Sequence, residues 1–114
     1  MDELIQKLRE FAAERDWEQF HSPKNLSMAL AVEVAELLEH FQWLTEEQSR
    51  NLEQETLARV QEEIGDVQIY LARLADQLGI SPLDAALDKL EVNRQKYPPD
   101  KARGNSKKST AFDR

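Results

Sequence analysis

Four acidic side chains stand at matched spacing in two apolar stretches of this 114-residue sequence. Glu33 and Glu36 form the first pair, and Glu63 and Asp66 form the second. Residues three apart on a helix lie about 60° apart around its axis, so each pair projects to one side. Glu33 is also in register with the apolar residues of its stretch, where a helical bundle would normally place Leu. Two antiparallel helices could therefore bring all four carboxylates together.

Such a cluster is unstable without compensation. Like charges about 4 Å apart repel by ~1 kcal/mol in water, and by several times more in a partly buried site. Desolvation of the charged forms adds to this cost. Either some of the carboxyl groups are protonated or a cation lies between them. A ligand set made only of carboxylate oxygens suits Mg²⁺, for which Mn²⁺ can substitute, and Mg²⁺ usually bridges to a phosphate.

The acids have two other interpretations. A di-iron carboxylate bundle would carry Glu-x-x-His on two helices. Here the one nearby His, His40, follows Glu36 by four residues, and the stretch around Glu63 has none. The second alternative is a non-catalytic helical interaction module whose carboxylates are merely solvated. It leaves unexplained why acids interrupt the apolar pattern at two matched places, so the metal site is favoured.

The elements that position these acids are expected to be helical. Only 3 Gly and 4 Pro occur, at the edges of periodic stretches, which favours an all-α chain. Short connections indicate an antiparallel helical bundle. We expect helices over Asp2–Asp16, from Asn25 or Ser27 to Leu44, over Leu57–Leu78, and from Ser81 to a stop at Tyr97, with a short capped turn at Thr45–Gln48.

The third of these helices has the most regular apolar stripe. Its members alternate steps of three and four and are Leu57, Val60, Ile64, Val67, Leu71, Leu74 and Leu78. This is more apolar surface than three partner helices of this size would cover. The excess indicates self-association into a homo-oligomer.

Composition limits the remaining classes of function. We expect one helical domain over residues 1–99 and a polar, flexible tail over residues 100–114. The formal net charge of −7 argues against binding to a nucleic acid polymer, since that affinity comes mainly from Lys and Arg. The absence of Cys excludes disulfides and zinc–thiolate sites. No apolar run is long enough to cross a bilayer, and charges interrupt the first apolar residues, so we expect a cytoplasmic protein rather than a membrane or secreted one.

The two acidic pairs also carry a family resemblance. Glu33-x-x-Glu36 followed by Glu63-x-x-Asp66 resembles the signature of the all-α nucleoside triphosphate pyrophosphohydrolases, the MazG-like enzymes. Four segments are similar to the dCTP pyrophosphatase branch of that family: Arg15–Leu26, Glu36–Trp43, Asp66–Leu71 and Asn93–Pro98. The resemblance implies an oligomeric helical bundle, a tetramer built as a dimer of dimers or a dimer. Its expected activity is Mg²⁺-dependent cleavage of the α–β phosphate bond of dCTP, or of modified dCTP, for nucleotide-pool housekeeping.

The resemblance also implies roles for individual residues. The metal-binding and catalytic residues would be Glu33, Glu36, Glu63 and Asp66. The base and sugar pocket would be lined by Trp17, His21, Trp43 and Tyr70. The sugar and phosphates would be contacted, within a subunit or across a subunit boundary, by Lys89, Asn93, Lys96 and Tyr97. Which of the four acids acts as general base stays open, and each Trp taken alone could instead cover the helical core.

One position departs from the family pattern. Spacing places Leu8 where some close relatives supply a His to the base pocket. Loss of a hydrogen-bonding group there puts cytosine selectivity in doubt and leaves the hydrolysis itself unaffected. The alternative is therefore a pyrophosphohydrolase with a broad or non-cytosine range of nucleoside triphosphates.

Overall fold

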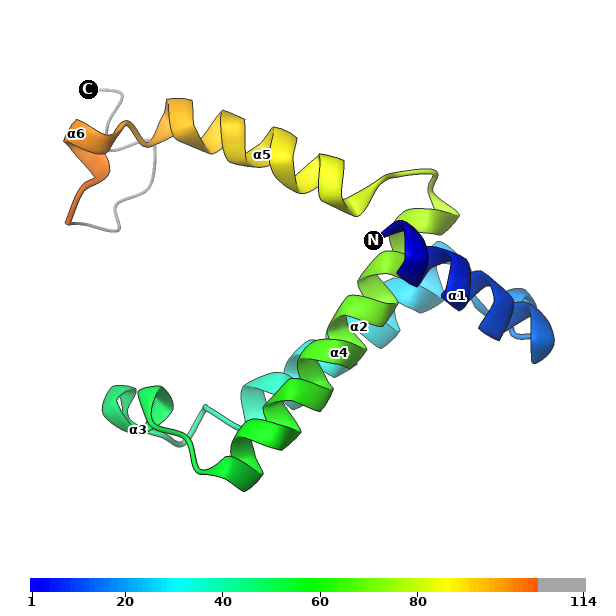
Figure 1. Cartoon of the computed structure of the whole chain (residues 1–114), viewed down its shortest axis with the longest axis horizontal. Helices are drawn as coiled ribbons and strands as arrows, with labels where there is room; N and C mark the ends of the chain where they lie inside the picture. The colour runs from blue at the N-terminus through cyan, green and yellow to red at the C-terminus, as the bar shows by residue number, and fades with distance from the viewer. Residues whose placement is uncertain (105–114) are drawn as a thin grey trace. The chain divides into compact units, whose positions relative to one another are not determined.

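The structure, a computed structural model, describes residues 1–104, without the side chains of Lys101 and Ala102. Residues 105–114, which belong to the predicted polar tail, lie outside the described residues. The elements in chain order are α1 (Asp2–Glu14), the 3₁₀ helix η1 (Glu18–Phe20), α2 (Pro23–Glu39), α3 (Glu46–Arg50), α4 (Gln54–Gln77), α5 (Pro82–Lys96) and α6 (Pro99–Ala102) (Figure 1). No strand occurs within residues 1–104, so the prediction of an all-α chain is confirmed. None of the described helices combines the length and the hydropathy that a membrane span requires.

The chain divides into two compact units. The first, Met1–Ile80, contains α1 to α4, and the second begins at Ser81 and contains α5 and α6. The sequence did not indicate α6, which lies where the tail was expected to begin and has a Pro at its first turn. The division into a domain of residues 1–99 and a tail of residues 100–114 stays a prediction.

The first unit is built on the pairing of α2 with α4. The two helices run antiparallel and pack against each other, and α1 packs on α4 (Figure 1). The buried apolar residues lie at these contacts: Ala12 on α1, Leu26 on α2, and Val60, Ala72 and Ala75 on α4. Most of them are Ala, and small side chains allow close approach of the helices. The antiparallel pairing expected for the acid-bearing helices is thus confirmed.

The apolar stripe of α4 separates into two rows. One row faces its own unit, with Val60 buried and Val67 and Leu74 half-buried. The other row recurs every seven residues and is 40–54% exposed: Leu57, Ile64, Leu71 and Leu78. The first unit therefore leaves a continuous apolar row of α4 uncovered.

The predicted start of α2 was wrong by a few residues. The helix begins at Pro23, and its N-cap is Ser22 rather than Asn25 or Ser27. The Ser22 hydroxyl accepts a hydrogen bond from the backbone N–H of Asn25 at 3.1 Å. Ser followed by Pro is a strong start signal, because Ser satisfies a free N–H and Pro has a preset helical φ. This start places His21 immediately before the N-cap of the helix.

The predicted end of α2 was also wrong. The helix stops at Glu39 instead of continuing to Leu44. The backbone N–H groups of His40 and Phe41 donate to carbonyls three residues back, at 3.3 Å and 2.9 Å, and so tighten the chain into a turn. Trp43 consequently lies in the turn after α2 and not on the helix.

The other helix ends follow the sequence signals. Thr45 and Gln48 form a reciprocal capping box at the start of α3. Gly79 follows α4 with a positive φ of 69°, which suits a residue without a Cβ. Ser81 caps α5 by accepting from the N–H of Asp84 at 3.3 Å.

Candidate metal and ligand site

The middle of the α2–α4 pair holds a cluster of carboxylates. Glu33 and Glu36 of α2 meet Glu63 of α4, and one carboxylate oxygen from each lies within 4.8 Å of the others. All three side chains are half-buried. The arrangement follows from the antiparallel pairing of α2 with α4 and from the register of each acid with the inner face of its helix. These three predicted metal ligands are therefore brought together.

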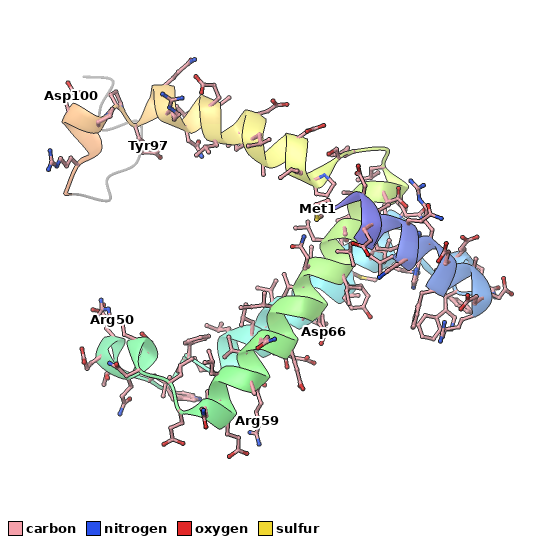
Figure 2. The ribbon with its side chains drawn as sticks, in the orientation of Figure 1. Met1, Arg50, Arg59, Asp66, Tyr97 and Asp100 are labelled. Atoms are coloured by element: carbon pink, nitrogen blue, oxygen red, sulfur yellow. The ribbon has the colours of Figure 1, made fainter. Side chains whose placement is uncertain are left out.

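Asp66, the fourth predicted ligand, lies one turn after Glu63 on α4 (Figure 2). It is half-buried, and its negative charge contributes to raising the pKa of both Glu33 and Glu63. Asp66 is thus close enough to act on the cluster, although the tightest group is made by the other three acids.

Two carboxyl groups of the cluster, those of Glu33 and Glu63, have raised pKa values. Burial raises the pKa of Glu33 from 4.5 to about 7, helped by hydrogen bonding to Glu36 and by the surrounding negative charges. Burial and the nearby Glu36 also raise the pKa of Glu63. Within the described residues, the Oε2 atoms of Glu33 and Glu63 are buried and have no hydrogen-bond partner. Buried polar atoms are normally satisfied, so these two oxygens fit a site that a divalent cation completes.

His40 adjoins the cluster and was not predicted as a site residue. Its Nε2 lies 3.8 Å from Oε1 of Glu63, and its charge, when present, lowers the pKa of that carboxyl group. The signal was available in the sequence, since His40 follows Glu36 by four residues and so shares its side of the helix end.

A cavity of about 280 Å³ lies in the first unit beside the cluster. Its lining is mostly apolar and aromatic and consists of Lys7, Leu8, Phe11, Ala12, Trp17, His21, Asp66, Ile69, Tyr70 and Arg73. Three predicted pocket residues, Trp17, His21 and Tyr70, are therefore brought together here. Leu8, the position that departs from the family pattern, is in the same lining.

The chain reversal after α1 delivers Trp17 to this cavity. Asp16 adopts a positive φ of 54°, and the N–H of Trp17 donates back to the carbonyl of Ala12 at 2.9 Å. The Trp17 ring then packs edge-on against Phe11, with ring centroids 5.5 Å apart, and against His21 at 6.3 Å. These contacts fix one aromatic wall of the cavity.

Asp66 belongs both to the acidic cluster and to the cavity. It lines the cavity with Tyr70, which follows it by one turn, and its charge acts on Glu33 and Glu63. A molecule in the cavity thus has the acidic cluster at its edge. The geometry suits a flat ring that carries anionic groups.

The remaining predicted site residues are not among the residues that line this cavity. Trp43 is 86% exposed and lies beyond the C-terminal end of α2, whereas His21 precedes its N-terminal end. Within one chain, Trp43 and the cavity are therefore at opposite ends of α2. The other four predicted contacts to sugar and phosphate belong to the second unit, where they occupy α5 and its C-cap: Lys89, Asn93, Lys96 and Tyr97.

Arg73 is a member of the cavity lining that sequence reasoning missed. It is 4% exposed, and its Nε donates to Nδ1 of His21 at 3.2 Å. A signal was present, because residues 63, 66, 70 and 73 succeed one another in steps of three and four and so form one stripe of α4.

Comparison with known proteins agrees with the geometry. Residues 28–112 match the MazG-like family. The chain is 48% identical over 103 residues to dCTP pyrophosphatase 1 of Homo sapiens, covering 89% of this chain and 61% of the relative. It is 47% identical over 107 residues to the Mus musculus protein of the same name, covering 92% and 63%. The chain thus spans only about three fifths of the length of these mammalian relatives. A solved structure of a pyrophosphatase from Archaeoglobus fulgidus superposes with a TM-score of 0.76 at 46% identity, covering 86% of this chain and 92% of that one.

Proposed function

The chain belongs to the MazG-like family, and on that premise we propose that it hydrolyses dCTP, or a modified dCTP, to the monophosphate and pyrophosphate. The observation that carries the proposal is the position of Asp66, which joins the acidic cluster to an aromatic cavity. The names of the mammalian relatives support dCTP as the substrate. In the balanced reaction, a water oxygen bonds to the α-phosphorus, the bond from that phosphorus to the bridging oxygen breaks, and pyrophosphate leaves.

The acids are assigned two tasks in this reaction. Glu33, Glu36 and Glu63, with Asp66 beside them, would hold Mg²⁺, which when bound neutralises triphosphate charge and orients a water molecule. A carboxylate of the cluster that is not occupied as a ligand accepts the proton of the attacking water.

We assign the second unit to the leaving group. Lys89 and Lys96 lie seven residues apart on one side of α5, with Asn93 between them. Their positive charge would offset the charge that develops on pyrophosphate, and Asn93 and Tyr97 would contact the sugar. This assignment rests on the family resemblance of the segment Asn93–Pro98.

We further propose that the protein acts as a homo-oligomer, a dimer or a dimer of dimers. The support is the uncovered row of α4, whose four members are 40–54% exposed: Leu57, Ile64, Leu71 and Leu78. Burying such a row against a second copy would remove apolar area from water at about 25 cal/mol per Å². Association would also be the route by which Trp43 reaches a cavity, namely that of another subunit.

The test is release of pyrophosphate from each common nucleoside triphosphate, with Mg²⁺ and then with excess chelator. We expect metal-dependent release from dCTP above all others. Leu8 in the cavity lining favours a second candidate, a broader pyrophosphohydrolase, which would act comparably on several nucleotides. Absence of release from every nucleotide would reject both and leave a non-catalytic module.

Replacing Trp17 by Leu is expected to raise KM for dCTP about tenfold and to leave kcat nearly unchanged. The Trp17 ring forms a wall of the cavity, and stacking of a base on an aromatic contributes roughly 1–3 kcal/mol. Steady-state kinetics and nucleotide titration of the Trp fluorescence measure the change. An unchanged KM would mean that Trp17 only covers the core. The same substitution at Trp43 tests its carried-over role, since a comparable loss there would require a neighbouring subunit.

A further inference from the structure

A series of side-chain contacts connects the surface of α1 to the cavity. The Nε of Arg9 on α1 donates to Oδ2 of Asp76 on α4 at 2.8 Å. The same Oδ2 lies 3.7 Å from Nη1 of Arg73. Arg73 in turn donates from Nε to Nδ1 of His21 at 3.2 Å. Two of these residues, Arg73 and His21, line the cavity.

The last contact determines where His21 carries its proton. A guanidinium nitrogen can only donate, so Nδ1 of His21 must be the unprotonated acceptor. A neutral imidazole then has its single N–H at Nε2. Burial and the positive charge of Arg73 lower the pKa of His21, against a smaller opposing effect of Glu18, and so favour the neutral ring. His21 is thus a hydrogen-bond donor through Nε2.

Stability alone does not account for Arg73. Its side chain is almost fully buried, and its Nη2 has no hydrogen-bond partner among the described residues. An unsatisfied buried donor destabilises a fold, and an apolar residue of similar volume often replaces a buried charge without loss. The link between α1 and α4 is already made by Arg9 and Asp76. A role in the cavity explains why a costly group lies here.

We propose that Arg73, oriented by Asp76, is a positioning residue that fixes His21 in the Nε2-protonated form, so that the cavity selects a ring offering a hydrogen-bond acceptor. The acceptor class is a carbonyl oxygen or an unprotonated ring nitrogen. The identity of that ring rests on the proposed function, under which it is the pyrimidine base, whose O2 and N3 are acceptors in cytosine. The donor at His21 also gives the cavity a polar recognition group in the absence of one at Leu8.

The first experiment measures the protonation of the His21 ring directly, by NMR of the nucleotide-free protein. Nitrogen chemical shifts of the His21 imidazole distinguish the two tautomers. We expect the wild type to be protonated at Nε2, and Arg73→Met to show a mixture of tautomers. Arg59→Met is the matched control, because Arg59 is also on α4 but is exposed and bonds only to Glu55 within the described residues. It should leave the His21 signals unchanged.

The second experiment is a double-mutant cycle on hydrolysis of dCTP. Arg73→Met should raise KM about three- to tenfold, the usual range for one hydrogen bond, with kcat within about twofold. In a His21→Leu background the same change should have no further effect on KM. Thermal melts check that each variant is folded.

Either of two results overturns the proposal: a His21 shift pattern that Arg73→Met does not alter, or an effect of Arg73→Met on KM that persists in full without His21. The nitrogen shifts need no substrate. They decide the relation between Arg73 and His21 even if the wild type releases no pyrophosphate, which would reject the proposed function alone.

Discussion

Glu63→Gln is expected to lower the rate of pyrophosphate release by about 100- to 10,000-fold, the range found when a positioned acid–base group is lost. Glu63 contributes an oxygen to the tight group of three acids, and its Oε2 is buried without a partner in the described residues. Gln keeps the size of the side chain and the helix. It replaces a charged acceptor with a neutral amide, which neither neutralises a cation nor accepts a proton from water. Steady-state release of pyrophosphate with saturating Mg²⁺ measures the loss.

Glu62→Gln is the matched control for this variant. Glu62 adjoins Glu63 on α4 and undergoes the same change in charge, but its side chain is exposed. We expect its turnover to stay within about twofold of the wild type. Without metal, Glu63→Gln should melt no lower than the wild type, because it removes one of several carboxylates that repel each other. Near wild-type turnover in Glu63→Gln would exclude Glu63 from the mechanism.

The sequence was sufficient to predict the acidic cluster, because helical periodicity alone determines which side of a helix a residue occupies. Glu33 and Glu63 replace apolar residues in a regular pattern, and that register becomes proximity once two such helices pair. The connection between the two helices, residues 40–53, contains the short helix α3 and lets α4 return antiparallel along α2. The acidic cluster thus follows from the periodicity of two helices and from their antiparallel pairing.

The ends of α2 were harder to predict. The apolar pattern continues through Phe41 to Leu44, although the backbone has already turned at His40. Periodicity reports which residues are apolar and not where the backbone hydrogen bonds change. This error changes the position of Trp43, a predicted pocket residue. A helix that continued to Leu44 would have placed Trp43 on α2, whereas it lies in an exposed turn.

Arg73 illustrates a limit of a different kind. Most helical Arg residues are solvated, and the position of Arg73 on the same stripe of α4 as Glu63, Asp66 and Tyr70 indicates its side of the helix but not its burial. Its burial depends on His21, 52 residues away in the chain, and on Asp76, which Arg9 of α1 also binds. Such a network exists only in the tertiary structure. The exposed apolar row of α4 shows the same limit. The sequence indicates that α4 has more apolar surface than its partners cover, but it does not indicate which surface packs against that row.

Without divalent cations, Glu33→Gln is expected to be more stable than the wild type at about pH 8 and equal to it below about pH 4. The pKa of Glu33 is raised from 4.5 to about 7 in the folded protein. Between these values the folded state binds more protons than the unfolded state, so the free energy of unfolding falls as pH rises. The contribution of protonated Glu33 is complete below its ordinary pKa and is lost as pH rises through about 7. Gln resembles the protonated acid and has no such loss.

Wild type and Glu33→Gln must be compared with each other, because His21 changes the free energy of unfolding with pH in the opposite direction to Glu33. Its pKa is lowered below the ordinary value of 6.5, so its contribution to stability rises with pH through that region. The pKa of Asp76 is lowered by its hydrogen bond to Arg9, and that group stays ionised throughout this window. Both contributions are shared by wild type and variant and cancel in their difference. Urea denaturation followed by circular dichroism, at several pH values with chelator present, measures that difference.

Mg²⁺ should reverse the order of the two proteins. A cation that binds only the folded state stabilises it by about 4.1 kcal/mol at a free concentration 1,000 times Kd. Binding requires ionised carboxylates, so the wild type gains this stabilisation at about pH 8, where the repulsion among its acids is otherwise greatest. Glu33→Gln lacks a charged ligand and should gain much less. If Mg²⁺ stabilises both proteins equally, the cation binds outside the cluster. If their pH profiles coincide in chelator, Glu33 ionises as an ordinary solvated acid, and the destabilised cluster that motivates the metal site does not exist.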